Sequence, residues 1–241
     1  MKIFKTVIQV HLLFITLFLF SNSGKAQSNI NLKQLKDTTN KVYGSSDLLN
    51  LGEFYVPEHV YATGHPYFIT DEYVLASVTV YNNSFDKVKA RYNIEKDQLI
   101  MKVSVDTGVY VTIVAKEDWV HSFKINDHYF VSVNGLQPST EVKGYCEEVY
   151  NGKRKFYIKY KKRFIDNYTE LSPNGFFSVM KISKYVYDQN TFIPISTKRE
   201  FLRLFATHKA EIKEFMRKNK IKYTRASTAQ IAALMQYCDG L

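Results

Sequence analysis

The chain of 241 residues has few of the residues that characterise disulfide-rich, disordered or collagen-like proteins. It contains only 2 Cys, 10 Gly and 5 Pro, whereas 45% of its residues are hydrophobic. Two cysteines are too few for a disulfide scaffold, and this balance of residues excludes a disordered or collagen-like chain. Beyond the N-terminal region no apolar run reaches the about 20 residues that a spanning helix needs. The composition therefore favours one large domain, with or without an appendage.

Residues 1–26 have the organisation of a secretory signal peptide. Two lysines precede an almost continuous apolar run over 6–20, and small residues, Gly24 and Ala26, lie three and one residues before a cleavage site at Gln27. A membrane anchor is the alternative, but the apolar run is shorter than a span. The sequence therefore predicts an exported protein of the periplasm or the cell exterior, which could associate with the outer membrane. It predicts no transmembrane span after cleavage.

The next two segments differ in pattern. Residues 27–50 are polar and lack clear periodicity, which predicts a loose N-terminal arm. Over 51–196, apolar and polar residues alternate with the period of two that is typical of strands with one buried face, and turn-forming residues separate these runs. Strands that follow one another through tight turns pair as neighbours. The fold class predicted is therefore mainly β, a curled antiparallel meander of about eight to ten strands.

Four turns carry the strongest local signals. Asn82-Asn83, Asn126-Asp127 and Asn151-Gly152 are predicted to form two-residue hairpin turns, because their residues tolerate positive φ angles. The last of these is the strongest signal and predicts a type I′ turn. The sequence at 106–108 predicts a three-residue turn with Gly108 in the left-handed region.

Over 197–241 the period changes to that of α-helices. A capping box at Thr197 begins the first helix, and apolar residues then recur at intervals of three and four as far as Met216. A second capping sequence begins at Ser227. We therefore predict two C-terminal α-helices that pack on the sheet through their apolar faces.

The basic charge is concentrated in the helical segment. The whole chain has a formal charge of +10, and residues 27–241 alone have 30 basic and 23 acidic residues. Residues 197–225 contain ten of these basic residues and only three acidic ones. Their net charge of +7 equals the entire excess of residues 27–241. One interpretation is a solvated outer helix face. The other is a surface for an anionic envelope component, such as lipid phosphate or an acidic glycan, or for another envelope protein. The residues that would form this surface are Lys209, Lys213, Arg217 and Lys220.

A second basic run lies at 154–163 on a predicted strand. Lys155, Lys159 and Lys161 share one face of that strand, which we expect to be solvated. No nucleic-acid-binding motif accompanies either basic run, so no nucleic-acid partner is expected.

The two cysteines, Cys146 and Cys238, leave two alternatives open. An oxidising compartment permits a disulfide between them, whereas two separately buried thiols need no bridge. Glu147 and Glu148 follow Cys146 directly, and neighbouring carboxylates raise a thiol pKa, so a thiolate nucleophile is disfavoured. The two glutamates face opposite sides of a strand and cannot act as a carboxylate pair unless the strand is distorted.

Motifs for metal binding, serine chemistry and phosphate cradling are missing, so no cofactor or metal is predicted. The chemistry-bearing groups that remain are dispersed. An extracytoplasmic enzyme could use His59, His65, Asp71 and Glu72 if they converge in one cleft. A carrier of an apolar ligand or lipid would instead show a cavity lined by Tyr and Phe. The sequence favours a third role, non-catalytic binding or structure.

The pattern of three segments resembles a family of uncharacterised exported proteins that are common in the envelopes of Bacteroidota-type bacteria. The segments are GHPYF at 64–68, DKVKARYN at 86–93 followed by DQL at 97–99, and YCEEVYNG at 145–152 before a Lys-rich strand. The resemblance extends over about 55–237. It implies export and a β-rich body with a helical end, and it implies no activity and no site residue. Cys146 stands where such proteins often have an aromatic residue.

Overall fold

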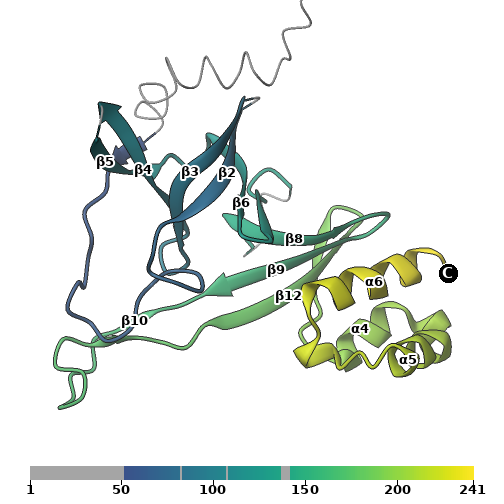
Figure 1. Ribbon diagram of the computed structural model, residues 1–241. Helices are drawn as coiled ribbons and strands as arrows, with labels where there is room; N and C mark the ends of the chain where they lie inside the picture. The colour runs from purple at the N-terminus through teal and green to yellow at the C-terminus, as the bar shows by residue number, and fades with distance from the viewer. Residues whose placement is uncertain (1–51, 82, 107, 137–141) are drawn as a thin grey trace, which may run out of the picture. The chain divides into compact units, whose positions relative to one another are not determined.

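The computed structural model describes residues 52–241 except 82, 107 and 137–141 (Figure 1). The predicted signal peptide at 1–26 and the polar arm at 27–50 lie outside the described residues. The described residues belong to one structural unit, Ser45–Leu241, which contains both the β-rich part and the helices.

Eleven strands form one antiparallel sheet in the order β1-β5-β4-β3-β2-β6-β7-β8-β9-β12-β13. Their bounds are β1 (Gly52–Phe54), β2 (Val74–Val80), β3 (Asn83–Asn93), β4 (Gln98–Asp106), β5 (Val109–Ala115), β6 (Val120–Ile125), β7 (His128–Ser132), β8 (Tyr145–Asn151), β9 (Lys155–Lys161), β12 (Lys181–Asp188) and β13 (Thr191–Pro194). The mainly β, antiparallel fold is confirmed, and the sheet is open, with β1 and β13 at its edges.

Most neighbours in the sheet are neighbours in the sequence, as a meander requires. Three pairings depart from this: β1 with β5, β2 with β6, and β9 with β12. Between β9 and β12 the chain forms a small two-stranded sheet, β10 (Phe164–Ile165) with β11 (Phe176–Phe177). The sheet is therefore assembled from hairpins joined by a few longer-range pairings.

Three of the four predicted turns form hairpins close to their predicted positions. Asn126-Asp127 is confirmed, because Ile125 pairs with His128 and Asn126 has a φ of 53°. Gly108 has a φ of 80°, which confirms the left-handed region. The turn predicted at Asn82-Asn83 begins one residue earlier, at Tyr81, which takes a φ of 49°.

The type I′ turn predicted at Asn151-Gly152 is wrong. Neither residue has a positive φ, and Asn151 pairs with Lys155, so three residues rather than two form the loop. Glycine nevertheless suits this position, because a Cβ on Gly152 would force the Tyr150 hydroxyl and the Asp239 carboxylate to shift. The glycine signal at this position reflects a close approach between hairpin and helix rather than a left-handed backbone.

The C-terminal segment contains three α-helices rather than the two predicted. They are α4 (Lys198–Leu204), α5 (Lys209–Lys218) and α6 (Thr228–Asp239), with 3-10 turns η1 (Ala206–His208) and η2 (Tyr223–Arg225). Both predicted capping boxes form, at Thr197 and at Ser227. The predicted first helix is divided because Phe205 leaves the helical region, with φ −112° and ψ 49°. Among the described residues no helix has the length and apolarity that crossing a membrane requires.

The helices pack on the sheet, as predicted (Figure 1). A single apolar cluster contains strand residues such as Phe156 and Val186 together with helix residues such as Phe201 and Ile212. Helix α6 lies against β8. A second, smaller cluster, which includes Tyr157, lies on the other face of the same strands, because successive strand residues point to opposite sides.

Aromatic rings fill the interior of the main cluster. Phe123 stacks on Phe130 with ring centroids 5.0 Å apart, and Tyr92 and Tyr145 meet these rings edge-on. Phe68 packs on Phe130 at 5.1 Å. The aromatic richness of the chain therefore serves packing in this part of the structure, where offset and edge-to-face pairs are favourable.

Candidate functional site

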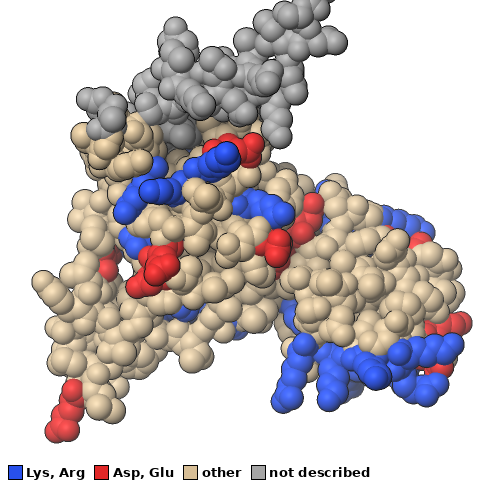
Figure 2. All heavy atoms as spheres, in the orientation of Figure 1, with Lys and Arg blue, Asp and Glu red and all other residues tan. Residues whose placement is uncertain are grey.

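The four basic residues predicted to bind an anionic partner are exposed. Lys209, Lys213 and Arg217 lie on α5, and Lys220 follows the end of that helix. Figure 2 shows Lys and Arg side chains gathered along the lower edge of the helical segment. Arg217 forms an ion pair with Glu214, with N–O distances of 2.6 and 3.0 Å.

The other three members of the basic surface keep their charge available. Within the part of the chain that the structure describes, no ion pair involves Lys209, Lys213 or Lys220. Three exposed ammonium groups therefore remain for a partner. We call Lys209, Lys213 and Lys220 the α5 surface.

The two cysteines do not form the disulfide considered from the sequence, because both are free and buried. Cys146 belongs to the smaller apolar cluster and Cys238 to the larger one, so the sheet separates them. Burial raises the pKa of each thiol to about 12. Neither is a thiolate at neutral pH, and the cause is burial rather than the two glutamates that follow Cys146.

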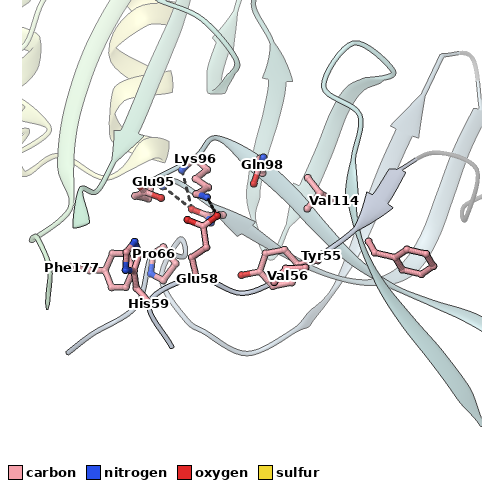
Figure 3. Close-up of a pocket in the computed structure, with 12 residues that line it drawn as sticks. Tyr55, Val56, Glu58, His59, Pro66, Glu95, Lys96, Gln98, Val114 and Phe177 are labelled. Atoms are coloured by element: carbon pink, nitrogen blue, oxygen red, sulfur yellow. Dashed lines mark hydrogen bonds and ion pairs between the residues drawn. The ribbon is translucent and has the colours of Figure 1, made fainter. Parts of the chain in front are cut away.

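His59, the first of the four dispersed candidate catalytic groups, lines a small pocket of about 180 Å³ (Figure 3). Its ring stacks on Phe164 with centroids 3.6 Å apart. In the same pocket Glu58 forms an ion pair with Lys96. The stacking of His59 on an aromatic ring indicates a packing role.

The other three candidates do not line that pocket. The Nδ1 of His65 accepts a hydrogen bond from the Tyr67 amide at 3.2 Å, and the Asp71 carbonyl accepts one from Arg91 at 2.9 Å. The Glu72 amide donates to a threonine hydroxyl two residues earlier. Asp71 acts electrostatically on His65, whereas His59 and Glu72 contact other residues, so the structure does not bring all four groups to one pocket. Among the described residues no group of three His, Cys, Asp or Glu side chains could hold a metal ion.

A larger cleft of about 430 Å³ lies where the sheet meets the helical segment. The strands contribute His128, Ile158, Tyr160, Ile182 and Lys184, and the helical segment with the residues before it contributes Ser196, Thr224, Ala226, Ser227 and Thr228. Clefts between structural elements with a few convergent polar groups are the usual places for ligands.

A buried carboxylate organises one wall of this cleft. Glu147 is only 3% exposed, and it accepts hydrogen bonds from the Tyr160 hydroxyl at 2.5 Å and from His128 Nδ1 at 2.8 Å. The hydrogen bond to Glu147 raises the pKa of His128 above its ordinary value. Because Glu147 holds Nδ1, His128 keeps Nε2 for other contacts. Ser227 also lines the cleft, but its hydroxyl accepts the Gln230 amide in the helix cap, so it is not a free nucleophile.

Lys184 forms a second polar group of the cleft. It is 8% exposed, and its Nζ donates to the Tyr223 carbonyl at 2.9 Å and lies 4.8 Å from the centre of the Tyr223 ring. Burial lowers the pKa of Lys184. This lysine joins β12 to the segment between α5 and α6, so it holds the two walls of the cleft together.

Sequence reasoning missed the pairing of His128 with Glu147. The two residues lie on β7 and β8, and their register depends on the loop between these strands, which carries no regular pattern. The sequence signal that could have helped is the position of Glu147 on one strand face between the apolar residues Tyr145 and Val149, since a buried carboxylate needs hydrogen-bond donors.

The pH dependence of stability should report the His128–Glu147 pair. The pKa of His128 lies above 6.5 in the folded protein. The stabilisation that the charged His128 gives to the fold is therefore fully present below pH 6.5, and it is lost as pH rises through the pKa of His128 in the folded protein. We expect His128→Gln to remove this decline from denaturant melts taken across about pH 6–9. Unchanged pH dependence in the variant would contradict the pair.

His65 provides the control for this experiment because its pKa is shifted in the opposite direction. Burial, and then Lys162, lower the pKa of His65. Its contribution is therefore present above pH 6.5 and is lost as pH falls through the folded value. His65→Gln should alter the acid side of the profile and leave the decline above pH 6.5 in place.

Comparison of the chain with protein-family models, with curated proteins and with solved structures finds no match.

Proposed function

We propose that the protein is an exported cell-envelope protein with a non-catalytic binding role, and that it binds an anionic envelope component through the α5 surface. The observation that carries the proposal is the exposure of Lys209, Lys213 and Lys220 without an ion pair among the described residues. Lipid phosphate is the partner we put first, because clustered lysines bind anionic membrane surfaces.

The expectation of export rests on the sequence. The signal-peptide organisation of 1–26 and the resemblance to exported envelope proteins both support it. A partner outside the cytoplasm that carries many negative charges is a lipid headgroup or an acidic glycan. The position of the basic excess on one helical segment suits such a partner better than an evenly distributed charge would.

Binding has more support than the two alternatives. The four dispersed groups that an enzyme would need do not line one pocket: His59 stacks on a phenylalanine, and His65, which Asp71 influences electrostatically, accepts a hydrogen bond from a backbone amide. The aromatic side chains that would line the cavity of an apolar-ligand carrier instead contact one another, with ring centroids 5.0 Å apart for Phe123 and Phe130.

The α5 surface contributes little to folding. Exposed charges are each worth about 0–1 kcal/mol of stability, so three unpaired lysines have no evident structural role. A variant with reversed charge should therefore fold, and any loss of binding can be assigned to the surface itself.

The triple variant Lys209→Glu, Lys213→Glu, Lys220→Glu should lose retention on vesicles that contain anionic lipid. Each lysine near such a surface contributes about 1 kcal/mol, so apparent affinity should fall by about 100-fold or more. Binding of the native protein should also weaken as salt rises, because the Debye length shortens. Vesicle co-sedimentation measures both effects.

The matched control reverses three exposed lysines elsewhere, Lys124, Lys143 and Lys153. This control has the same net charge as the test variant, so it separates a local surface from a general charge effect. Equal loss of binding in both variants would contradict the α5 surface. Native protein that binds an acidic polysaccharide but no anionic vesicle would replace lipid phosphate with a glycan as the partner.

A further inference from the structure

A basic groove of about 450 Å³ lies along β9 and β12 and the residues that flank them. Four basic side chains, two serines and Tyr185 line it. Tyr185 packs on the smaller apolar cluster, so the groove lies on the face of the sheet that the helices do not cover. It is therefore distinct from the α5 surface.

The register of the strands brings like charges together. Lys161 on β9 lies directly opposite Lys181 on β12, and Lys159 lies opposite Ser183. Directly opposed residues of an antiparallel pair point to the same face, and like charges in such a pair are destabilising. Arg163, two residues after Lys161 in the sequence, adds a third cation to the lining of the groove.

Only one of the four cations has an anionic partner in the described part of the chain. Lys159 forms an ion pair with Asp97 at 2.5 Å and also donates to the carbonyls of Lys143 and Tyr145. Lys161, Arg163 and Lys181 line the groove without a carboxylate among the lining residues. The groove thus has an excess of three positive charges.

A second opposed lysine pair in the same sheet shows how the fold can accommodate such charges. Lys89 on β3 lies opposite Lys102 on β4. The Lys89 ammonium lies 5.2 Å from the Tyr110 ring centre, and that of Lys102 lies 4.4 Å from the ring centre of Tyr73. Each cation is therefore stabilised by an aromatic face. No such ring contact and no ion pair involves Lys161 or Lys181 among the described residues, so an external anion could supply the compensating charge.

We propose that this groove binds the phosphate group of a small ligand. A phosphate dianion would compensate the opposed Lys161 and Lys181. The Arg163 guanidinium can give two parallel hydrogen bonds to phosphate oxygens, a geometry that lysine alone cannot provide. The volume falls in the range of small-molecule sites, which suits a phosphorylated small molecule as well as free phosphate.

Thermal melts at constant ionic strength test the proposal, with inorganic phosphate, glucose 6-phosphate and neutral glucose as probes. A ligand that binds only the folded state raises the melting temperature, by about 5–10 °C at a concentration 100 times its Kd for a protein of this size. Glucose should give no shift. An equal shift with both phosphates identifies free phosphate as sufficient, and a larger shift with glucose 6-phosphate identifies a phosphorylated molecule.

Lys181→Gln gives the sharpest variant. Without ligand its melting temperature should equal or exceed that of the native protein, because a like-charge pair is removed. At the same phosphate concentration its Kd should be at least about tenfold weaker, so its shift should fall to about half of the native shift or less. Lys102→Gln also removes one member of an opposed lysine pair but lies outside the groove, so it should retain the native phosphate shift.

Two results would overturn the proposal: no shift with either phosphate probe, or a Lys181→Gln shift equal to that of the native protein. The α5 variant Lys209→Glu, Lys213→Glu, Lys220→Glu separates this site from the proposed envelope surface. It should keep the phosphate shift while it loses vesicle binding, so either proposal can fail while the other stands.

Discussion

Phe201→Ala should lower the free energy of unfolding by about 3–5 kcal/mol, because the substitution leaves a cavity in a fully buried position. Phe201 is 0% exposed, and its ring lies 5.1 Å from the rings of both Phe205 and Tyr223. It therefore joins α4 to the turn before α6 and to the core beneath. Phe205, which is 6% exposed at the end of α4, should give a smaller loss when truncated.

Lys213→Ala on α5 is the control, since an exposed position should change stability by less than about 0.5 kcal/mol. Urea melts of the three variants provide the comparison. Equal midpoints for Phe201→Ala and Lys213→Ala would mean that the helical segment is not docked on the sheet as the structure has it. Removal of the Phe201 ring should also open the cleft between the sheet and the helical segment. The ring packs on Tyr223, and the Tyr223 carbonyl accepts the Lys184 hydrogen bond that joins the two walls of this cleft.

Local signals predicted the elements better than their arrangement. The turn at Asn126-Asp127 and the capping boxes at Thr197 and Ser227 depend on residues a few positions apart, and all three form. The pairings of β2 with β6 and of β9 with β12 leave no comparable mark, because the residues they join are far apart in the sequence. Counting hairpins predicted a meander of about eight to ten strands, close to the eleven of the main sheet, but it did not predict the three longer-range pairings.

Two local sequence signals were present, but the structure explains them differently from the prediction. Gly152 follows an asparagine as in a type I′ turn, yet the side chains of Tyr150 and Asp239 are what favour a glycine there. The apolar residues from Phe201 to Met216 have helical spacing throughout, yet the chain breaks the helix at Phe205. The break lets α4 and α5 bury their apolar faces in one cluster, a tertiary effect that periodicity does not contain.

The same distinction applies to the candidate sites. The α5 surface could be predicted from the sequence, because the basic residues that form it lie close together in one helical segment. The Glu147 network and the opposed Lys161 and Lys181 were not, because each depends on the register between strands. The sequence placed Lys161 among several lysines on one strand face. Lys181, which lies opposite it in the sheet, follows the β10–β11 insertion and so is distant in the sequence.

Asp97 and Gly144 form a contact that connects the core to the basic groove. The Tyr92 hydroxyl donates to the Asp97 carboxylate, which also accepts from the Tyr145 amide at 3.4 Å and pairs with Lys159 at 2.5 Å. Gly144 has a φ of 71°, and a Cβ there would occupy the position of the Asp97 carboxylate. Gly144→Ala should therefore displace Asp97 and separate it from its three partners.

We expect Gly144→Ala to cost about 3–5 kcal/mol of stability. The left-handed backbone contributes about 1–2 kcal/mol, and the remainder comes from the loss of the Asp97 carboxylate as acceptor, which leaves the Tyr92 hydroxyl and Lys159 with backbone carbonyls alone. Since Lys159 and Asp97 keep 19% and 27% of their side-chain surfaces exposed, the ion pair contributes less than a fully buried one would. Thermal or urea melts measure the loss.

Two glycines separate the causes. Gly108 has a φ of 80°, but no atom lies within 4 Å of the place that a Cβ would take, so Gly108→Ala should show the backbone cost alone, about 1–2 kcal/mol. Gly135 has neither a positive φ nor a close neighbour, so Gly135→Ala should be close to neutral. A Gly144→Ala loss no larger than that of Gly108→Ala would contradict the contact with Asp97. A larger loss would show that the collision with Asp97 causes the difference, because both glycines have a left-handed backbone and only Gly144 would bring a Cβ onto Asp97.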